Sequence, residues 1–374
     1  MQKKTTKKSE TTQRKLTTAL LVGLCLAFSA GAIKAKEYIL TGLKPDKLAL
    51  VDTRARKLER TYVVPDAAPG ILTVTPAPDG SRAYALVNRW ESVSGIDLDS
   101  GEQVFRANFS GDGRRVKGMF GMDISPDGRE LAVFQSPVKL ELGEYRVEDT
   151  YIAIYDTGAG LDAKPVRSFP APRRTAILAY STDGNKLYAI GWDVVVFDPR
   201  SGKQLGVHPI RNWGKANFTE PDVLDVWPQW EQAQVFSTPY FTVATDKAAD
   251  DPAAYRMGMA TLDLSNDNFV MNEYENFAVI IFSTVVNPVK RNEVFGTYTQ
   301  LSKIDIAENK LVNRIDLDHT YYAINISSDG KEVYVGGTMD DIGIYDSATL
   351  KKIGSIKFPG GEDMALSSLR IINR

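Results

Sequence analysis

A ten-residue pattern recurs three times in the chain and limits the folds that the chain can adopt. It begins at Ser125 (SPDGRELAVF), at Ser181 (STDGNKLYAI) and at Ser327 (SSDGKEVYVG). In each copy the Asp side chain can cap a tight turn and the Gly can adopt a positive φ, so the pair closes a β-hairpin. The residues after the turn alternate in the way that is typical of a strand with a neighbour on each face. The chain therefore repeats one hairpin.

A second pattern recurs beside the first: a β-rich run that ends in Asp and is followed by a turn and another strand. Successive copies are mostly separated by 41 to 45 residues, and the seven aspartates are Asp52, Asp97, Asp156, Asp198, Asp263, Asp305 and Asp346. A period just above forty residues in an all-β chain predicts a propeller in which each repeat is one blade. The residues after the leader contain no long amphipathic helix, which argues against a parallel α/β sheet. We therefore expect an all-β, seven-bladed β-propeller of four-stranded antiparallel blades.

The ends of the chain indicate how the ring closes. The first repeat has no preceding turn of the Pro-Asp-Gly type, and the last repeat is followed by an unpaired strand-like segment, MALSSLRIIN, at residues 364–373. If this segment is the innermost strand of the blade that begins at Glu37, both terminal strands pair and no sheet edge stays open. The sequence predicts closure by these two strands.

The first 35 residues differ from the rest. A basic leader is followed by a short apolar run, LTTALLVGLCLAFSAGA, that ends in small residues. This anatomy is typical of a secretory signal peptide, with cleavage after Ala32 or Ala35. A membrane anchor is the alternative, but the run is short for a span and no second basic flank follows it. We expect residues 36–374 to be exported as a single propeller with no membrane anchor.

Removal of the leader restricts the chemistry open to the mature chain. Cys25 is the one cysteine, and the mature chain keeps two histidines, His208 and His319. Disulfides, thiolate ligands, a typical zinc site and a Cys-x-x-Cys-His haem attachment are thus excluded from it. The leader carries seven Lys and Arg and one Glu, which leaves 38 basic against 46 acidic residues, a net charge of −8. An acidic exported protein is a poor candidate for binding nucleic acid.

Two carboxylate pairs stand out, Asp250 with Asp251 and Asp340 with Asp341. Such pairs can bind calcium or act as acid and base, but they are more often solvated loop charges, and we expect the latter here. His319 is interpreted as a hydrogen-bonded structural group. The sequence contains no phosphate-binding glycine loop and no Gly-x-Ser-x-Gly motif. We therefore predict no catalytic, cofactor-binding or metal-binding residue in this chain.

Three insertions lengthen otherwise regular repeats, at residues 136–148, 211–222 and 245–254. In a blade with strands a to d, the b–c and d–a connections lie on one face of the ring, and the a–b and c–d connections lie on the other. All three insertions fall in b–c or d–a connections, so they gather on one face. Long loops collected on one face are more often functional than incidental, although surface variation without a partner stays an alternative.

Large aromatic residues lie in the connections on this same face. We expect them to form a surface for a partner or for the wall of a substrate cavity, because exposed rings are typical anchors of interfaces. The alternative is that each ring packs onto its own loop. The four candidates are Trp90, Tyr145, Trp213 and Phe218.

Four stretches suggest a family: KEYILTGLKPDKLALVDTRARKLERTYVVPDA from Lys36, GMFGMDISPDGRELAVFQSPV from Gly118, YAINISSDGKEVYVGGTMDDIGIYD from Tyr322, and the closing LRIINR. In order, loop lengths and termini, the mature chain resembles the β subunit of quinohaemoprotein amine dehydrogenase. The resemblance implies a periplasmic heterotrimer with a dihaem cytochrome c α subunit and a small γ subunit that carries cysteine tryptophylquinone.

In that family the seven-bladed β subunit holds no redox cofactor, supports the other subunits and helps to wall the substrate cavity. Primary amines are oxidised to aldehydes, and electrons pass from the quinone to the two haems c and on to a soluble acceptor. No catalytic residue is transferred to this chain, because the family's quinone and base belong to another subunit. Two alternatives stay open: a free-standing lactonase-like propeller enzyme and a binding propeller of the YVTN type.

Overall fold

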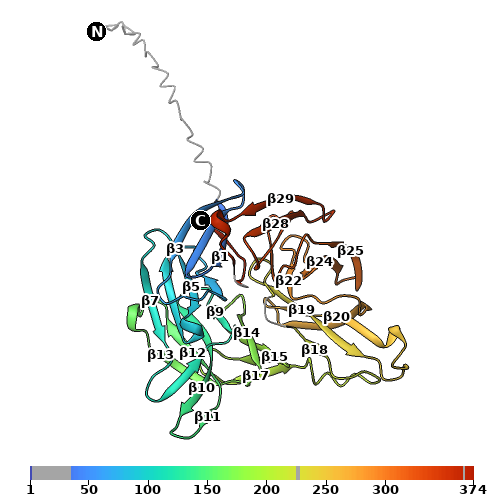
Figure 1. The fold of residues 1–374 in the computed structure, drawn as a ribbon, viewed down its shortest axis with the longest axis horizontal. Coiled ribbons are helices and arrows are strands. Elements are labelled where there is room, and N and C mark those ends of the chain that lie inside the picture. The colour runs from blue at the N-terminus through green and yellow to red at the C-terminus, as the bar shows by residue number, and fades with distance from the viewer. Residues whose placement is uncertain (2–34, 225–227, 365–366) are drawn as a thin grey trace. The chain divides into compact units, whose positions relative to one another are not determined.

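Seven antiparallel sheets follow one another along the chain and are arranged around a common centre (Figure 1). The computed structural model describes residue 1 and residues 35–224, 228–364 and 367–374. Lys36–Arg374 form one compact unit. Six sheets have four strands, and the third has two further strands that pair with its long second strand. The predicted all-β, seven-bladed propeller is confirmed. Residues 2–34, which include most of the predicted signal peptide, lie outside the described part.

The second to seventh blades are each built in chain order, from the innermost strand outward. The second blade comprises β4 (Val74–Pro76), β5 (Arg82–Val87), β6 (Ser92–Asp97) and β7 (Gln103–Asn108). The third comprises β9 (Met122–Ile124), β10 (Glu130–Leu140), β12 (Tyr151–Asp156) and β13 (Pro165–Pro170), with β8 (Arg114–Lys117) and β11 (Tyr145–Val147) added to β10. The fourth comprises β14 (Thr175–Tyr180), β15 (Leu187–Gly191), β16 (Val194–Phe197) and β17 (Gln204–His208).

The remaining blades repeat this order. The fifth comprises β18 (Asp222–Val223), β19 (Val235–Val243), β20 (Tyr255–Asp263) and β21 (Asn268–Asn276). The sixth comprises β22 (Ser283–Val286), β23 (Glu293–Thr297), β24 (Gln300–Asp305) and β25 (Lys310–Asp316). The seventh comprises β26 (Ala323–Ile326), β27 (Glu332–Gly336), β28 (Asp341–Asp346) and β29 (Lys352–Lys357). Helical structure in the described residues is limited to four single 3₁₀ turns, η1 (Asn88–Trp90), η2 (Gly160–Asp162), η3 (Pro252–Ala254) and η4 (Pro359–Gly361).

The repeated decapeptide forms the inner hairpin of a blade, as predicted. In the third blade, Ser125 Oγ donates to Asp127 Oδ1 at 2.6 Å and accepts the N–H of Glu130 at 3.0 Å. Gly128 completes the turn at a φ of 73°. The copies in the fourth and seventh blades have the same Ser-to-Asp hydrogen bond. Serine, aspartate and glycine are therefore needed at these positions to shape the turn.

The repeated aspartate caps the outer hairpin of each blade. In the second blade, Asp97 Oδ1 accepts the N–H groups of Asp99 at 3.0 Å and Ser100 at 2.8 Å. The Ser100 amide lowers the pKa of the Asp97 carboxyl, because a hydrogen bond to the charged form favours it. Equivalent backbone bonds are made by Asp52, Asp156, Asp198, Asp263, Asp305 and Asp346. The seven aspartates are structural.

The first blade joins the two ends of the described unit. It consists of β30 (Arg370–Asn373), β1 (Glu37–Leu43), β2 (Lys47–Asp52) and β3 (Lys57–Val63). The innermost strand β30 pairs antiparallel with β1, from Glu37 opposite Asn373 to Leu40 opposite Arg370. The predicted closure is confirmed, with a shorter strand than the segment 364–373. The C-terminal strand thus lies beside the blue N-terminal strand in Figure 1.

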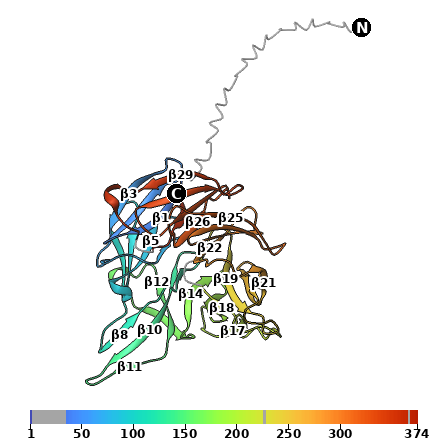
Figure 2. The same ribbon diagram turned by 45° about the vertical axis from the view of Figure 1, so that its right-hand side comes forward.

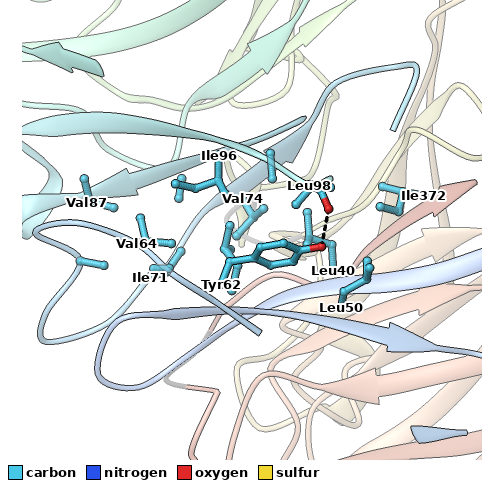
Figure 3. Packing of buried hydrophobic residues seen from close by; sticks show 14 of the residues in the cluster. Leu40, Leu50, Tyr62, Val64, Ile71, Val74, Val87, Ile96, Leu98 and Ile372 are labelled. Atoms are coloured by element: carbon cyan, nitrogen blue, oxygen red, sulfur yellow. Dashed lines mark hydrogen bonds between the residues drawn. The ribbon is translucent and has the colours of Figure 1, made fainter. Parts of the chain in front are cut away.

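Hydrophobic side chains fill the interfaces between neighbouring blades. Figure 3 shows the cluster between the first and second blades, where the hydroxyl of Tyr62 donates to the carbonyl oxygen of Leu98 at 2.7 Å. Leu40 and Ile372 enter this cluster from β1 and β30. On the other side of the first blade, Ile39 and Ile371 pack against the seventh blade. The closing strand therefore contributes to two blade interfaces.

Candidate functional site

The strand order defines two faces of the ring. We call the face with the b–c and d–a connections the insertion face, and the face with the a–b and c–d connections the turn face. The first predicted insertion comprises the end of β10 and β11, the second lies between β17 and the end of β18, and the third lies between β19 and β20. All three are b–c or d–a connections, so they share the insertion face, as expected from the sequence.

The longest insertion forms a small sheet of its own. β10 pairs with β12 as far as Gln135, after which Ser136–Leu140 pairs with β8 on one side and β11 on the other. Figure 2 shows these three strands extending beyond the rest of the blade. Leu142 is fully exposed at the hairpin tip, and Tyr145 is 77% exposed. This extension therefore presents apolar side chains to solvent.

Trp213 and Phe218 lie together in the connection between the fourth and fifth blades. Their ring centroids are 5.8 Å apart, and Trp213 also meets the buried ring of Tyr240 edge-on at 5.5 Å. The Lys215 ammonium lies 5.1 Å from the Trp213 ring and 4.4 Å from the Phe218 ring, and it pairs with Glu273 at 2.5 Å. Both rings are half-buried against their own loop and the fifth blade. This arrangement agrees with the alternative that each ring packs onto its own loop.

Trp90 is also half-buried. It ends η1, with a φ of 71°, and its ring centroid lies 6.3 Å from that of Phe120. The Lys117 ammonium lies 5.4 Å from the Trp90 ring. Of the four predicted aromatic residues, Trp213 and Phe218 contact one another, Trp90 packs at a separate place, and Tyr145 is the one that is mostly exposed.

Exposed large apolar residues concentrate on the insertion face far more than the sequence suggested. Of those in the described propeller, two lie on the turn face, Leu161 and Val289, and seven lie on outermost strands. Ten lie on the insertion face: Met119, Leu140, Leu142, Tyr145, Val147, Trp192, Tyr255, Phe277, Ile280 and Met339. Trp192 occupies the two-residue turn between β15 and β16 and is 52% exposed, with the Arg211 guanidinium 5.0 Å from its ring. The short turn that contains Trp192 was the sequence feature from which the exposure of this ring could have been predicted.

A further aromatic cluster lies on the same face at the sixth blade. Phe282, Tyr298 and Tyr322 come from three successive connections, and their ring centroids are 4.4 to 5.5 Å apart. All three are half-buried. The insertion face is therefore rich in aromatic side chains on both sides of the ring centre.

The histidine and one of the carboxylate pairs meet near this face. His319 Nε2 lies 2.8 Å from Asp341 Oδ1, and its Nδ1 lies 3.0 Å from the carbonyl oxygen of Thr320. The Tyr321 hydroxyl donates to Asp341 Oδ2 at 3.0 Å. His319 is thus a hydrogen-bonded structural group, as predicted. The expectation of solvated loop charges is wrong for Asp341, which is buried because these neighbours satisfy it.

The other carboxylate pair also has a structural partner. Asp251 Oδ1 accepts the N–H of Ala253 at 2.8 Å and caps η3, whereas Asp250 is exposed. Within the described ranges, no group of three or more His, Cys, Asp and Glu residues is placed to hold a metal ion. The same residues include no helix long and apolar enough to cross a membrane.

Residues 228–234, in the a–b connection of the fifth blade, lie at the centre of the ring. Arg370 of β30, 3% exposed, fixes this segment. Its Nη1 donates to Gln229 Oε1 at 2.6 Å and pairs with the Glu231 carboxylate, and its guanidinium lies 5.2 Å from the Trp230 ring. Its Nε donates to the carbonyl oxygen of Val74 at 2.7 Å. Arg370 therefore links β30 to β4 and to the a–b connection of the fifth blade.

A buried carboxylate lies beside this centre. Asp123 of β9 is 6% exposed, and its Oδ2 accepts the N–H of Tyr180 at 2.7 Å. Burial raises the pKa of Asp123 to about 7; the nearby Glu231 charge adds to this, and Arg370 opposes it. Asp123 and Glu231 line a pocket of about 380 Å³ at the turn-face end of the centre. Sequence reasoning missed this site, because its residues come from distant repeats.

Replacing Asp123 should make stability less dependent on pH. The folded-state pKa lies above the unfolded value of about 4, so the charged form costs stability that grows between about pH 4 and pH 7. Asp123→Asn keeps an acceptor for the Tyr180 N–H and removes that cost. Denaturant unfolding should show the variant to be more stable than the parent at pH 8, by on the order of 2–4 kcal/mol, with the gain lost at pH 4.

Asp183→Asn is the control of opposite sign. The Ser181 hydroxyl and the Asn185 amide lower the pKa of Asp183 to about 2, so its charged form stabilises the fold above about pH 4, and that contribution is lost as the pH falls towards 2. This variant should be less stable than the parent at pH 8. A stability profile for Asp123→Asn that runs parallel to the parent's would contradict the assignment.

The chain matches no protein-family model and no curated protein sequence. Its structure is similar to hydrazine synthase from Kuenenia stuttgartiensis, with a TM-score of 0.56 and 16% identity over 84% of this chain and 90% of that chain. It is also similar to the dihydro-haem d1 dehydrogenase NirN in complex with DHE, with a TM-score of 0.52 and 12% identity over 90% of this chain and 75% of that chain. Since 1391 solved chains match, the fold is widespread, and these likenesses establish the propeller fold alone.

Proposed function

We propose that this chain is the cofactor-free propeller subunit of a periplasmic quinohaemoprotein amine dehydrogenase. The resemblance of residues 36–374 to that subunit supplies the class of complex, and the two similar structures, a synthase and a dehydrogenase, agree with a place in an enzyme. In such a complex the γ subunit would hold cysteine tryptophylquinone and the α subunit two haems c. This chain would support both partners and form part of the wall of the cavity in which primary amines are oxidised.

The concentration of exposed apolar side chains on the insertion face is the observation that carries the proposal. Single exposed apolar residues are ordinary on a protein surface, but their collection on one face is typical of a surface that a partner covers. The turn face provides an internal comparison, because it has two such residues where the insertion face has ten. The insertion face is therefore where the quinone-bearing subunit would dock.

Within this face the residues have different tasks. Trp213, Phe218 and Trp90 are half-buried, so each keeps part of its surface exposed while it packs against a neighbouring ring. Leu142 and Tyr145 project from the β10–β11 hairpin and would become buried only in the complex. A ring or side chain that is desolvated on association is the usual source of binding energy at an interface.

Native purification from the periplasm tests the assignment. The chain should co-elute with haem absorbance and with a small crosslinked chain, and the assembly should oxidise primary amines. Expressed alone, the exported chain should be colourless and inactive towards amines, since its partners would carry the cofactors. A chain that purifies from the periplasm without partner subunits, or that binds haem or quinone covalently, would refute the proposal.

Substitutions at the hairpin tip should weaken assembly without unfolding the propeller. Leu142→Ser and Tyr145→Ser remove apolar surface that only a partner would bury, so each should cost about 1–3 kcal/mol of association free energy and leave the melting temperature of the isolated chain unchanged. Affinity for the purified partner subunits and thermal unfolding should be measured on the same variants. Leu161→Ser is the matched control, because Leu161 is also exposed but lies on the turn face. Equal affinity for all three variants would remove the argument for docking here.

A further inference from the structure

The pocket at the turn-face end of the ring centre has the size and lining of a ligand site. Its volume of about 380 Å³ is within the usual range for small-molecule pockets. Much of its wall is apolar, with Pro78, Pro126, Ile372 and Trp230 among the lining residues. The remaining lining is largely polar: it comprises the carboxylates of Asp123 and Glu231 together with Thr75, Ser181, Thr182, Gln232, Gln234 and Asn373. A few polar groups in an apolar wall are what fixes the orientation of a small ligand.

One oxygen of the Asp123 carboxylate is used by the fold and the other is not. Its Oδ2 is engaged by the Tyr180 N–H at 2.7 Å, and the amide of Ile124 also favours the charged form, though more weakly. Among the described side chains, no donor forms a hydrogen bond with its Oδ1. Unlike the Tyr180 hydroxyl, this oxygen is not a buried atom without a partner, and Asp123 lines the pocket, so the oxygen keeps access to it. The free oxygen belongs to a side chain that lines the pocket.

The charges around the pocket leave one carboxylate in excess. The Arg370 guanidinium pairs with Glu231 and occupies the face of Trp230, so it does not form an ion pair with Asp123. The groups that face Asp123 are the carboxylate of Glu231, the guanidinium of Arg370 and the phenol of Tyr180. Two carboxylates therefore share one cation, and the buried one needs a proton or a second cation as its counterion.

We propose that this pocket binds a primary alkylammonium group, with its N–H donors on Asp123 and Glu231 and its alkyl body against the proline and tryptophan wall. A carboxylate acceptor in an apolar pocket favours a cation that can donate hydrogen bonds and also bury carbon. A bare metal ion would need several more oxygen ligands and would leave most of the volume unfilled. The ammonium could come from a free amine or from the lysine side chain of a bound protein. The site lies on the face opposite the proposed docking surface and does not depend on that function.

Isothermal titration of the exported, purified chain tests this site. At pH 8, n-butylammonium should bind saturably with one site per chain, and 1-butanol, its neutral isostere, should not. Asp123→Asn should weaken binding at least tenfold. Asp193→Asn is the matched control. Asp193 Oδ1 also accepts a backbone N–H, from Ile210 at 2.7 Å, but Asp193 lies on the insertion face. The affinity of this variant for n-butylammonium should equal that of the parent. Affinity should also fall about tenfold between pH 8 and pH 6, as the Asp123 carboxyl becomes protonated.

Two further arms separate the possible ligands. A blocked lysine peptide that binds more tightly than n-butylammonium would identify a protein lysine as the source, and the reverse order would identify a free amine. Glu231→Gln provides a second variant should Asp123→Asn fail to fold, and it too should weaken binding. Failure of the parent to bind either ammonium compound, binding of calcium instead, or equal affinity of parent and Asp123→Asn would overturn the proposal. None of these results depends on whether partner subunits assemble.

Discussion

Truncation of the chain after Gly361 should abolish the folded propeller rather than weaken it slightly. The deletion removes β30 and with it the buried side chains of Leu369, Ile371 and Ile372. Loss of a single large core side chain costs about 2–5 kcal/mol, and a protein of this kind is stabilised by about 5–15 kcal/mol in total. The edge of β1 would also lose its partner and be open to pairing with other chains. We expect aggregation on expression, or a melting temperature lowered by more than about 10 °C.

A chain that ends at Asn373 is the control for this truncation. It lacks Arg374 but keeps every residue of β30, so its melting temperature should stay within a few degrees of the parent's. Analytical ultracentrifugation should show it to be as compact as the parent. A chain truncated after Gly361 that stays monomeric and equally heat-stable would show that closure by β30 is not what stabilises the ring.

Arg370→Ala should produce the second large effect. Removal of the guanidinium leaves Glu231 without its cation, next to the buried carboxyl of Asp123, and removes the hydrogen bond to the Val74 carbonyl oxygen. Breaking a buried ion pair in this way costs about 3–5 kcal/mol, because an uncompensated charge stays behind. Denaturant unfolding at pH 8 should show that loss, and the loss should be smaller at pH 5, where Asp123 is protonated.

A second substitution should restore part of the stability. Adding Glu231→Gln to Arg370→Ala removes the unpaired charge, so the double variant should be more stable than Arg370→Ala alone. Arg56→Ala breaks an ion pair with Glu332 that is partly exposed to solvent, and it should cost less than about 1 kcal/mol. If Arg370→Ala and Arg56→Ala lowered the free energy of unfolding by similar amounts, Arg370 would contribute no more to stability than a surface arginine.

The fold could be predicted from the sequence because its determinants are local. Ser125, Asp127 and Gly128 shape their turn through bonds among themselves and their immediate neighbours, so the same letters recur wherever the turn recurs. The face that carries the insertions followed from strand alternation alone. Closure by β30 could be inferred because one repeat lacked a strand and another segment was left over.

The details of the candidate surfaces could not be predicted in this way. Whether a ring is exposed depends on the space that the neighbouring blade leaves for it. Trp213 packs against the buried Tyr240, whereas Trp192, on a two-residue turn, stays 52% exposed. The central cluster depends on contacts between residues far apart, since Arg370 and Gln229 are separated by 141 positions. No period or local motif marks such a pair.

Closure by β30 also determines when the propeller can complete its fold. Glu37 pairs with Asn373, 336 positions later, so the first blade stays a three-stranded sheet until the last few residues of the chain are available. During synthesis each of the other six blades can complete its four strands, but the inner edge of the first blade stays unpaired until β30 is available. Contacts of such long separation slow folding and prolong the exposure of unpaired strands. A chain built in this way cannot complete its fold until its C-terminal residues are available.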